Sequence, residues 1–358
     1  MDNKEFLKEY LNAYSPVGNE FEGQKIWLNY IKNYTDKSFV DIHGSACAIL
    51  ASENSNYNVV IEAHCDEIAW QISNIESDGF IRVCRVGGSD NMIASSKTVV
   101  IHTDNNEKIK GVFGSPAVHV RKSYTEMSPT VDELWIDIGL DSKDDVLLKG
   151  IEVGNLVTFD DQFHELENYY VGRSLDNKIG GYIIAEVARY INKYEIKLPF
   201  NLIFVNAVQE EVGLYGASLI AKQLKPDLAL VHDVTHNTNT PKMNKSKDGD
   251  IKGGKGPVIE YSSQNHKDLI KLVKQTAIDK NIDIQLSTGS YGNDTVSFFL
   301  ENIPTMILST PLKYMHTTVE MAHKEDVSSA IELFILSLQN ISLNFIDDIK
   351  NPTYKYFL

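Results

Sequence analysis

The segment that decides the fold runs from Phe200 to Gly213 and reads FNLIFVNAVQEEVG. Residues up to Val208 are mostly apolar, which is typical of a strand buried on both faces of a sheet. Two adjacent carboxylates, Glu210 and Glu211, follow this strand. They repel each other unless a cation or a proton compensates their charge. The pair therefore indicates either a site at the end of the strand or the acidic first turn of a solvated helix.

Two other apolar segments end in the same way: residues 58–63 run into His64-Cys65-Asp66, and residues 228–231 run into His232-Asp233. Ligands of open α/β sheets gather beyond the carboxyl ends of strands, so remote segments can converge there. Further strands are expected at 283–286 and 304–308. Apolar residues at helical spacing predict helices over 177–194, 216–222, 267–280 and 324–340. This alternation predicts an α/β fold, a mostly parallel sheet flanked by helices.

Between these regions the pattern changes to short β-rich pieces separated by Gly, Asn and Asp turns. The predicted strands are 80–86, 98–102, 110–113, 133–137 and 155–159. Short, closely spaced strands are typical of a small barrel or sandwich. We therefore predict an α/β domain formed by residues 1–66 and 163–358, with an inserted β-barrel-like domain at 67–162.

Charge, apolar runs and cysteine content exclude several classes of protein. The 358 residues include 34 Lys and Arg against 49 Asp and Glu, a net charge of −15, which disfavours a nucleic-acid partner. The first twenty residues are charged and lack the apolar core of a signal peptide. The longest apolar runs, 228–231 and 333–336, are too short to cross a membrane. Cys47, Cys65 and Cys84 are an odd number without a disulfide spacing. We expect a cytoplasmic protein without a membrane partner.

His64 and Asp66 are separated by one residue on an extended strand, so their side chains share a face. A metal-bound imidazole usually donates its other N–H to a carboxylate or a carbonyl. Asp66 is well placed for that role. The His-x-Asp pattern alone is common by chance and needs support from other segments.

That support comes from two more segments. Asp176 lies in a Leu-Asp-Asn turn that opens a helix, and His316 ends Tyr314-Met315-His316. Together with the three strand ends they supply the oxygen and nitrogen ligands that suit Zn²⁺ or Co²⁺. Two ions about 3.5–4 Å apart can hold a substrate carbonyl and a bridging water. We therefore predict two divalent ions per subunit, with one glutamate of the Glu210–Glu211 pair binding metal and the other activating water.

These segments, in this order, resemble the M42 family of metalloaminopeptidases, which includes glutamyl aminopeptidases and tetrahedral, dodecameric peptidases. The resemblance covers nearly the whole chain. It extends to further motifs at 15–20, 86–88, 111–114, 116–119 and 254–259. It implies a metal-dependent aminopeptidase with the fold of two-metal exopeptidases.

The resemblance also implies a role for each site residue. His64 and Asp233 would hold one ion, Glu211 and His316 the other, and Asp176 would bridge the two. Glu210 would be the general base that takes a proton from the bridging water, and Asp66 would orient His64. The family further implies peptide substrates and a homo-oligomer, a dodecamer built from dimers, in which the inserted domain serves assembly.

Three alternatives stay open. An N-acyl amino acid amidohydrolase, or deacylase, would use the same two-metal chemistry. In such relatives, however, the extra domain follows the Glu-Glu pair. Here the long gap precedes it: 176 − 66 = 110 residues, against 211 − 176 = 35. A glycoside hydrolase would need two opposed carboxylates without metals. The third alternative is a metal-dependent assembly protein without catalysis.

Overall fold

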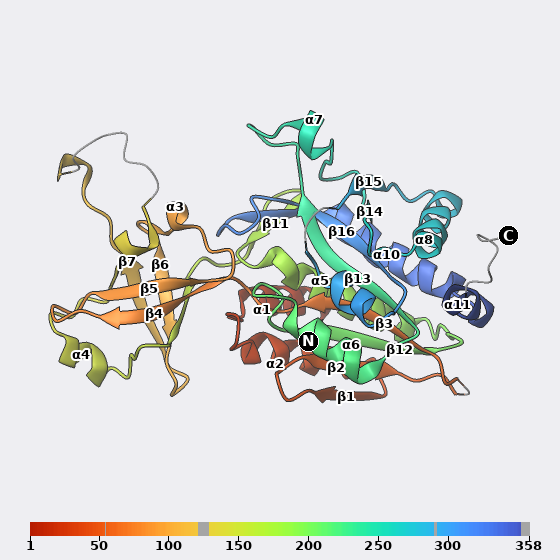
Figure 1. Ribbon diagram of the computed structural model, residues 1–358, viewed down its shortest axis with the longest axis horizontal. Coiled ribbons are helices and arrows are strands. Elements are labelled where there is room, and N and C mark those ends of the chain that lie inside the picture. The colour runs from red at the N-terminus through yellow and green to blue at the C-terminus, as the bar shows by residue number, and fades with distance from the viewer. Residues whose placement is uncertain (54, 121–128, 290–291, 352–358) are drawn as a thin grey trace. The chain divides into compact units, whose positions relative to one another are not determined.

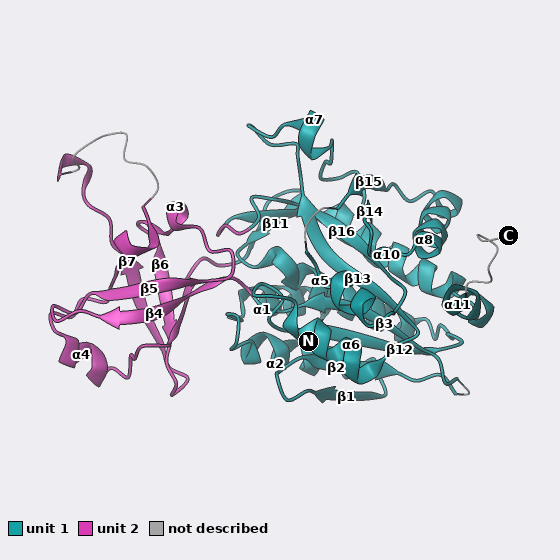
Figure 2. Cartoon of the chain, in the orientation of Figure 1, with its two compact units in different colours: residues 1–66, 163–315, 319–358 teal, residues 67–162, 316–318 magenta. Residues whose placement is uncertain are grey.

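The computed structural model describes residues 1–53, 55–120, 129–289 and 292–351, which form two compact units (Figures 1 and 2). Unit 1 comprises Met1–Asp66, Phe163–Met315 and Val319–Leu358, and unit 2 comprises Glu67–Gln162 and His316–Thr318. The sequence assigns 316–318 to the α/β domain together with its neighbours. In the structure this segment groups with unit 2, where Lys97 Nζ donates a hydrogen bond to Thr318 Oγ1 at 2.6 Å.

Unit 1 is built on one large sheet with the order β1-β2-β12-β3-β13-β16-β17-β11-β10, and β14 pairs with both β15 and β16. Its strands are β1 Lys37–Val40, β2 Ala46–Leu50, β3 Asn58–His64, β10 His164–Glu165, β11 Tyr169–Gly172, β12 Asn201–Ala207, β13 Leu228–His236, β14 Val258–Tyr261, β15 Gln285–Thr288, β16 Thr305–Lys313 and β17 Glu320–His323.

The predicted parallel sheet is confirmed for its centre. β12, β3, β13 and β16 run parallel to one another, and β14 pairs with β15 in parallel. The remaining pairs, including β2 with β12 and β16 with β17, are antiparallel. The sheet is therefore mixed, because its outer strands are joined to the centre by antiparallel pairing that the strand–helix alternation does not reveal.

Helices cover both faces of this sheet. α1, α2, α5, α8 and α10 pack on one face, and α6 and α9 pack on the other. The helices of unit 1 are α1 Asn3–Asn12, α2 Phe21–Ile31, α5 Leu175–Lys193, α6 Tyr215–Leu224, α7 Lys245–Asp248, α8 Lys267–Lys280, α9 Thr295–Leu300, α10 Lys324–Asn340 and α11 Leu343–Lys350. The predicted bounds of α8 and α10 are confirmed, and α5 begins two residues earlier than predicted.

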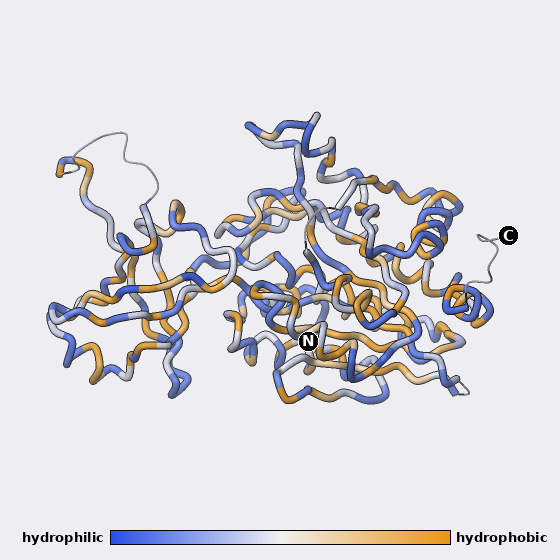
Figure 3. Tube along the Cα trace, in the orientation of Figure 1, coloured by the Kyte–Doolittle hydropathy of each residue, from blue (hydrophilic) through white to orange (hydrophobic). Residues whose placement is uncertain are grey.

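Apolar residues dominate the central strands, which are coloured mostly as hydrophobic in Figure 3. The first helices close over them through aromatic packing: the rings of Phe6 and Tyr30 stack with centroids 3.8 Å apart. Trp27 is fully buried, and its indole N–H donates to the carbonyl of Gly181 in α5 at 2.8 Å. Burying one such side chain stabilises a fold by about 1.5–3 kcal/mol, so this packing fixes α5 against the sheet.

Unit 2 is a closed barrel of six strands in the order β4-β5-β8-β7-β6-β9, as the inserted pattern predicts. Its elements are β4 Ala69–Ile75, β5 Ile81–Val86, α3 Asn91–Ala94, β6 Thr98–His102, β7 Lys108–Phe113, η1 Val118–Val120, η2 Val131–Glu133, β8 Ile136–Asp137, α4 Lys143–Leu148 and β9 Leu156–Phe159. Trp70 and Phe113 meet edge to face in its core with ring centroids 5.4 Å apart. The strand β4 is additional to the sequence prediction.

Within the described ranges, no single helix has the length and apolar character needed to cross a membrane. α10 and α11 pass that test only as a pair, and they are bent by 85° where they join. Cys47 and Cys65 are buried, Cys84 is exposed, and all three are free thiols.

Candidate active site

The carboxyl ends of the central parallel strands meet at one edge of the sheet, and the predicted site residues of unit 1 lie there. His64 is the last residue of β3 and is the register partner of Ala207, the last residue of β12. Glu210 and Glu211 follow β12 after a turn at Gln209, whose φ of 57° is left-handed. Four neighbouring parallel strands thus bring residues from remote segments together, as the pattern predicts.

Asp233 lies inside β13 rather than after it, because this strand continues to His236. Val231 is the register partner of Glu62, so Asp233, two residues on, is level with His64. The neighbouring His232 points to the other face. Its ring nitrogens lie 3.1 Å from Asn177 Oδ1 and 2.9 Å from Thr310 Oγ1. His232 therefore lies away from the group formed by His64 and Asp233.

His64 stands at the centre of a group of carboxylates and is 2% exposed. Its Nε2 lies 3.3 Å from Asp176 Oδ1, 3.8 Å from Asp233 Oδ1 and 3.9 Å from Glu210 Oε2. Burial alone would lower the pKa of this imidazole, but Asp176, Asp233 and Asp66 together raise it well above its usual value. Several buried carboxylates around one imidazole require a cation, and a bound divalent ion can replace the proton.

The donor set is suited to a metal. One ligand atom from each of His64, Glu210 and Asp233 lies within 4.8 Å of the others, and a carboxylate oxygen of Asp176 lies within 4.8 Å of one of Glu211. Imidazole nitrogen and carboxylate oxygen are the ligands that zinc and cobalt accept. The residues present therefore fit the predicted metal ions.

Asp66 is fully buried and holds the turn that carries the two glutamates. Its Oδ1 accepts the backbone N–H of Glu210 at 3.0 Å, and its Oδ2 accepts the N–H of Glu211 at 3.1 Å. Asp66 Oδ1 also lies 3.4 Å from His64 Nδ1. The His64 Nδ1 atom has no hydrogen-bond partner among the residues that the structure describes. Asp66 therefore contacts both the glutamate turn and the imidazole of His64.

The carboxyl of Glu210 is a much weaker acid than a glutamate in water. Burial raises its pKa to about 10; His64 opposes this shift, and the negative carboxyls of Asp233, Asp294 and Glu211 add to it. Without a nearby cation this carboxyl therefore holds a proton at neutral pH. A carboxyl whose affinity for a proton depends on neighbouring charge can take a proton and release it again during a reaction.

Asp176 enters the site from the start of α5. Its backbone N–H donates to Glu320 Oε2 at 3.1 Å, and the following Asn177 donates from Nδ2 to the carbonyl of His232 at 2.8 Å. A Cβ added at Gly180 would lie 2.4 Å from both Asn177 Oδ1 and His232 Nδ1. A glycine is therefore required one turn into α5, where the helix approaches β13.

His316 follows β16 by three residues and begins the segment 316–318 of unit 2. It adopts a left-handed φ of 61°, and Tyr314 before it has a φ of 60°. Two such residues close together reverse the chain sharply after β16.

Several buried carboxyls near the site are additional to the sequence prediction. Burial raises the pKa of Glu62 to about 8, and burial followed by the charge of Glu62 raises that of Asp294 well above its usual value. A sequence signal exists for Glu62: it is a charged residue inside an apolar strand, two residues before His64 and therefore on the same face. Asp294 precedes a six-residue helix, and its signal is the family resemblance, which places the segment 293–295 at the border of the pocket.

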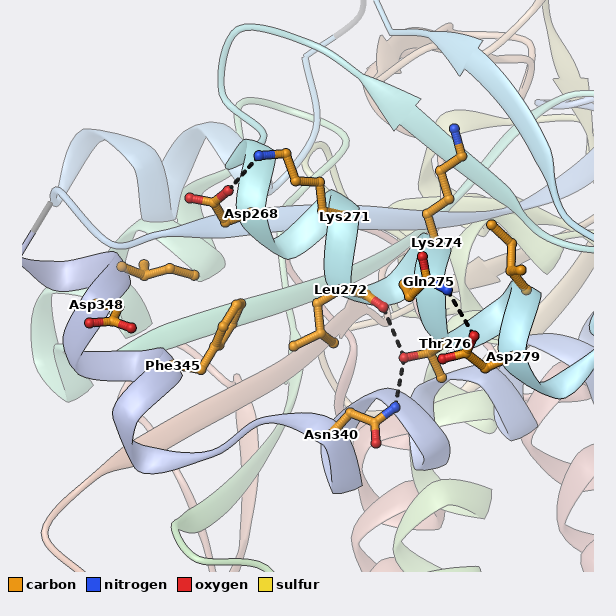
Figure 4. A pocket seen from close by; sticks show the side chains of 12 residues that line it. Asp268, Lys271, Leu272, Lys274, Gln275, Thr276, Asp279, Asn340, Phe345 and Asp348 are labelled. Carbon is orange, nitrogen blue, oxygen red and sulfur yellow. Dashed lines mark hydrogen bonds and ion pairs between the residues drawn. The ribbon is translucent and has the colours of Figure 1, made fainter. Parts of the chain in front are cut away.

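A cavity of about 770 Å³ lies elsewhere, between α8 and α11 (Figure 4). Its polar side chains bind one another: Lys271 Nζ donates to Asp268 Oδ1 at 3.0 Å, and Gln275 Nε2 donates to Asp279 Oδ1 at 2.8 Å. None of the predicted site residues lines it. This cavity is therefore separate from the candidate site.

Comparison with known proteins finds a family of aminopeptidases, both by a family model and by individual relatives. The family model described as M42 glutamyl aminopeptidase matches residues 44–333. The Escherichia coli (strain K12) protein FrvX is 30% identical over 339 residues, which are 92% of this chain and 93% of FrvX.

Two solved structures are similar over nearly their whole length. Aminopeptidase APDkam598 from the archaeon Desulfurococcus kamchatkensis has a TM-score of 0.90 at 29% identity, covering 97% of this chain and 98% of that one. The Pyrococcus horikoshii TET1 peptidase has a TM-score of 0.83 at 29% identity, with 94% and 98% covered. That peptidase can assemble into a tetrahedron or a large octahedral shell.

Proposed function

The chain belongs to the M42 family of glutamyl aminopeptidases, and from this premise we propose that it removes N-terminal residues from peptides at a centre of two divalent ions. The observation that carries the proposal is the convergence of three carboxylates on His64 Nε2 within 3.9 Å. Such a group is costly to bury unless cations occupy it.

We assign the ligands as the family resemblance implies. His64 and Asp233 hold one ion, Glu211 and His316 hold the other, and Asp176 bridges them. The closeness of Asp176 to both His64 and Glu211 supports the bridging role. His316 comes directly after Met315 of unit 1, so chain connectivity limits how far it can lie from the end of β16. When bound, Zn²⁺ or Co²⁺ would polarise the scissile carbonyl and make a bound water acidic near neutral pH.

Glu210 serves as the general base. Its position beside the proposed ligand His64, with Oε2 3.9 Å from Nε2, supports this role, because a carboxylate there can receive the proton of the attacking water and deliver it to the leaving amine. Asp66 keeps the backbone of Glu210 in place, because it accepts the backbone N–H groups of both Glu210 and Glu211.

We further propose that the enzyme works as a homo-oligomer, a dodecamer built from dimers, with unit 2 contributing to assembly. The assemblies described for the Pyrococcus horikoshii TET1 peptidase support this. Three free thiols suit a reducing compartment such as the cytoplasm. The acidic surface disfavours nucleic acid, and the substrates are peptides with a free amine.

The variant Glu210→Gln tests the mechanism. The amide keeps the shape of the side chain but cannot accept the proton. We therefore expect two bound ions per chain by metal analysis and turnover reduced by at least about 100-fold, the usual scale of acid–base catalysis.

Two results would contradict the assignment. Near-normal turnover would exclude Glu210 as the base, and loss of one ion would make it a ligand, as its closeness to His64 and Asp233 allows. Free and N-acetylated forms of one peptide should be assayed in parallel. Cleavage of the acetylated form alone would favour the amidohydrolase alternative.

A further inference from the structure

Glu260 is a buried carboxylate on the sheet face that carries the candidate ligands, and the proposed mechanism does not use it. In the register of the sheet, Ser309 of β16 is paired with Asp233 of β13 and with Val258 of β14. Paired residues point to the same side of a sheet, and so do residues two apart on one strand. Glu260 and Asp233 therefore face the same side of the sheet.

The carboxylate of Glu260 accepts hydrogen bonds from the side chains of Ser309 and Thr235. The Ser309 hydroxyl donates to its Oε1 at 2.6 Å. Its Oε2 lies against Gly289, where an added Cβ would come within 2.5 Å. Glycine has no side chain to cover this oxygen, and Glu260 keeps 7% of its surface exposed. The carboxylate is thus held in place by two hydroxyl groups, and a small part of the residue's surface stays exposed.

The distance from the metal centre suits the side chain of a bound amino acid. Neighbouring strands lie about 4.8 Å apart, and residues two apart on a strand are separated by about 6.6 Å. A carboxylate held by Ser309, beside Asp233, therefore lies roughly 5–9 Å from the Asp233 side chain. The ammonium of a lysine is about 6 Å from its Cα, counting bonds of about 1.5 Å.

The charge of this face favours a cation. Asp233 and Glu210 belong to the proposed metal centre, whereas Glu260 does not, and within the described parts of the chain Glu260 forms no ion pair with a lysine or an arginine. Burial raises the pKa of Glu260, and the charge of Asp233 adds to this shift. A basic side chain would compensate this charge, whereas an acidic one would add to it.

We propose that Glu260 is a specificity-determining residue that selects peptides with an N-terminal lysine or arginine. The inference rests on the proposed aminopeptidase function and adds its substrate class. It departs from the glutamyl preference in the family's description, because the side chain of an N-terminal glutamate would be repelled by the carboxylate of Glu260.

Glu260→Gln tests this with the p-nitroanilides of lysine, leucine and glutamate, assayed on the metal-loaded full-length protein. We expect the wild type to give its highest kcat/KM with lysine and its lowest with glutamate. In the variant, kcat/KM for lysine should fall about 10- to 100-fold, mainly through KM, the scale of a hydrogen bond to a charged group. The value for leucine should stay within about threefold, because leucine makes no such bond.

Two further variants serve as controls. Ser309→Ala removes the hydroxyl that holds Oε1 but leaves the charge, so lysine should remain the preferred substrate. Glu325→Gln changes a glutamate whose side chain is 80% exposed, so all three rates should be unchanged.

Equal losses on lysine and leucine in Glu260→Gln would show a structural role and overturn the inference alone. A wild-type preference for glutamate would also overturn it. Inactivity of the wild type on all three substrates, with Zn²⁺ or Co²⁺ supplied, would overturn the aminopeptidase proposal and this inference with it.

Discussion

Asp66 shows how one residue can organise the site without contacting a substrate. Each of its two oxygens accepts one backbone N–H, from Glu210 and from Glu211. A carboxylate that accepts two backbone N–H groups holds the backbone that carries them in one orientation. The orientation of both glutamate side chains therefore depends on this one buried group.

Glu20 lies beside Asp66 and gives a prediction about pH. Its Oε1 accepts the backbone N–H of Gly18 at 2.7 Å, and the residue is 4% exposed. Burial, and then the charge of Asp66, raise its pKa from 4.5 to about 8. The folded protein thus binds this proton more tightly than the unfolded chain does. The resulting stabilisation is complete below about pH 4.5 and is lost as the pH rises through about 8.

Glu20→Gln should remove this dependence, because glutamine keeps the acceptor oxygen and cannot ionise. Between pH 5 and pH 9 the wild type should lose of order 3 kcal/mol relative to the variant, from about 1.4 kcal/mol per pKa unit. Thermal unfolding at several pH values measures it, with the exposed Glu5→Gln as a control. Parallel curves for wild type and Glu20→Gln would show that Glu20 is ionised in the fold.

At the scale of elements, α5 connects the hydrophobic core to the site. Its interior residues, such as Ile183 and Ile184, are fully buried, and its first turn carries Asp176. The contact with β13 at Gly180 leaves no room for a methyl group. The placement of Asp176, the proposed bridging ligand, is therefore determined by the packing of a helix.

Gly180→Ala tests this dependence. The added methyl would force Asn177 and His232 apart, so we expect a loss of about 1–3 kcal/mol of stability from overpacking. Alanine otherwise favours a helix by about 1 kcal/mol over glycine. We also expect weaker metal binding, which titration calorimetry measures. Tyr190→Ala, a change at an exposed position of the same helix, should leave metal affinity unchanged. Unaltered affinity in Gly180→Ala would mean that α5 can shift without moving Asp176.

At the scale of the whole molecule, the site concentrates negative charge in a protein that is already acidic. The chain has a net charge of −15, and Asp66, Asp176, Glu210, Glu211 and Asp233 gather around one histidine. Like charges in a buried setting oppose folding unless cations compensate them. Metal binding should therefore stabilise the protein as well as activate it.

Metal removal tests this link. Dialysis against a chelator should lower the unfolding temperature, and Zn²⁺ or Co²⁺ should restore it. A ligand at about 1,000 times its Kd stabilises by about 4 kcal/mol. Differential scanning calorimetry measures the shift. In Asp176→Asn, which lacks the proposed bridging carboxylate, the shift should shrink. A chelated protein with unchanged stability and undiminished activity would argue against a metal centre.

The elements of unit 1 were predictable where their signal is local. The apolar runs of β3 and β12 and the periodicity of α8 and α10 depend on neighbouring residues in the sequence, so the sequence predicts them closely. α9 and α11 were not predicted. Six and eight residues are too few for a helical period to stand out. The length of β13 was underestimated, because its polar end is stabilised by pairing with β16.

The sequence by itself determined the α/β class, the barrel insertion and the strand ends that carry His64 and Glu210, because apolar pattern and chain order are local properties. Only the tertiary structure decided the antiparallel outer strands, the double hydrogen bonding of Asp66 and the burial of Glu260. Each of these depends on which remote segment supplies the hydrogen bond or excludes the water. The local sequence around a carboxylate does not show which remote residue will be its hydrogen-bond partner in the folded protein.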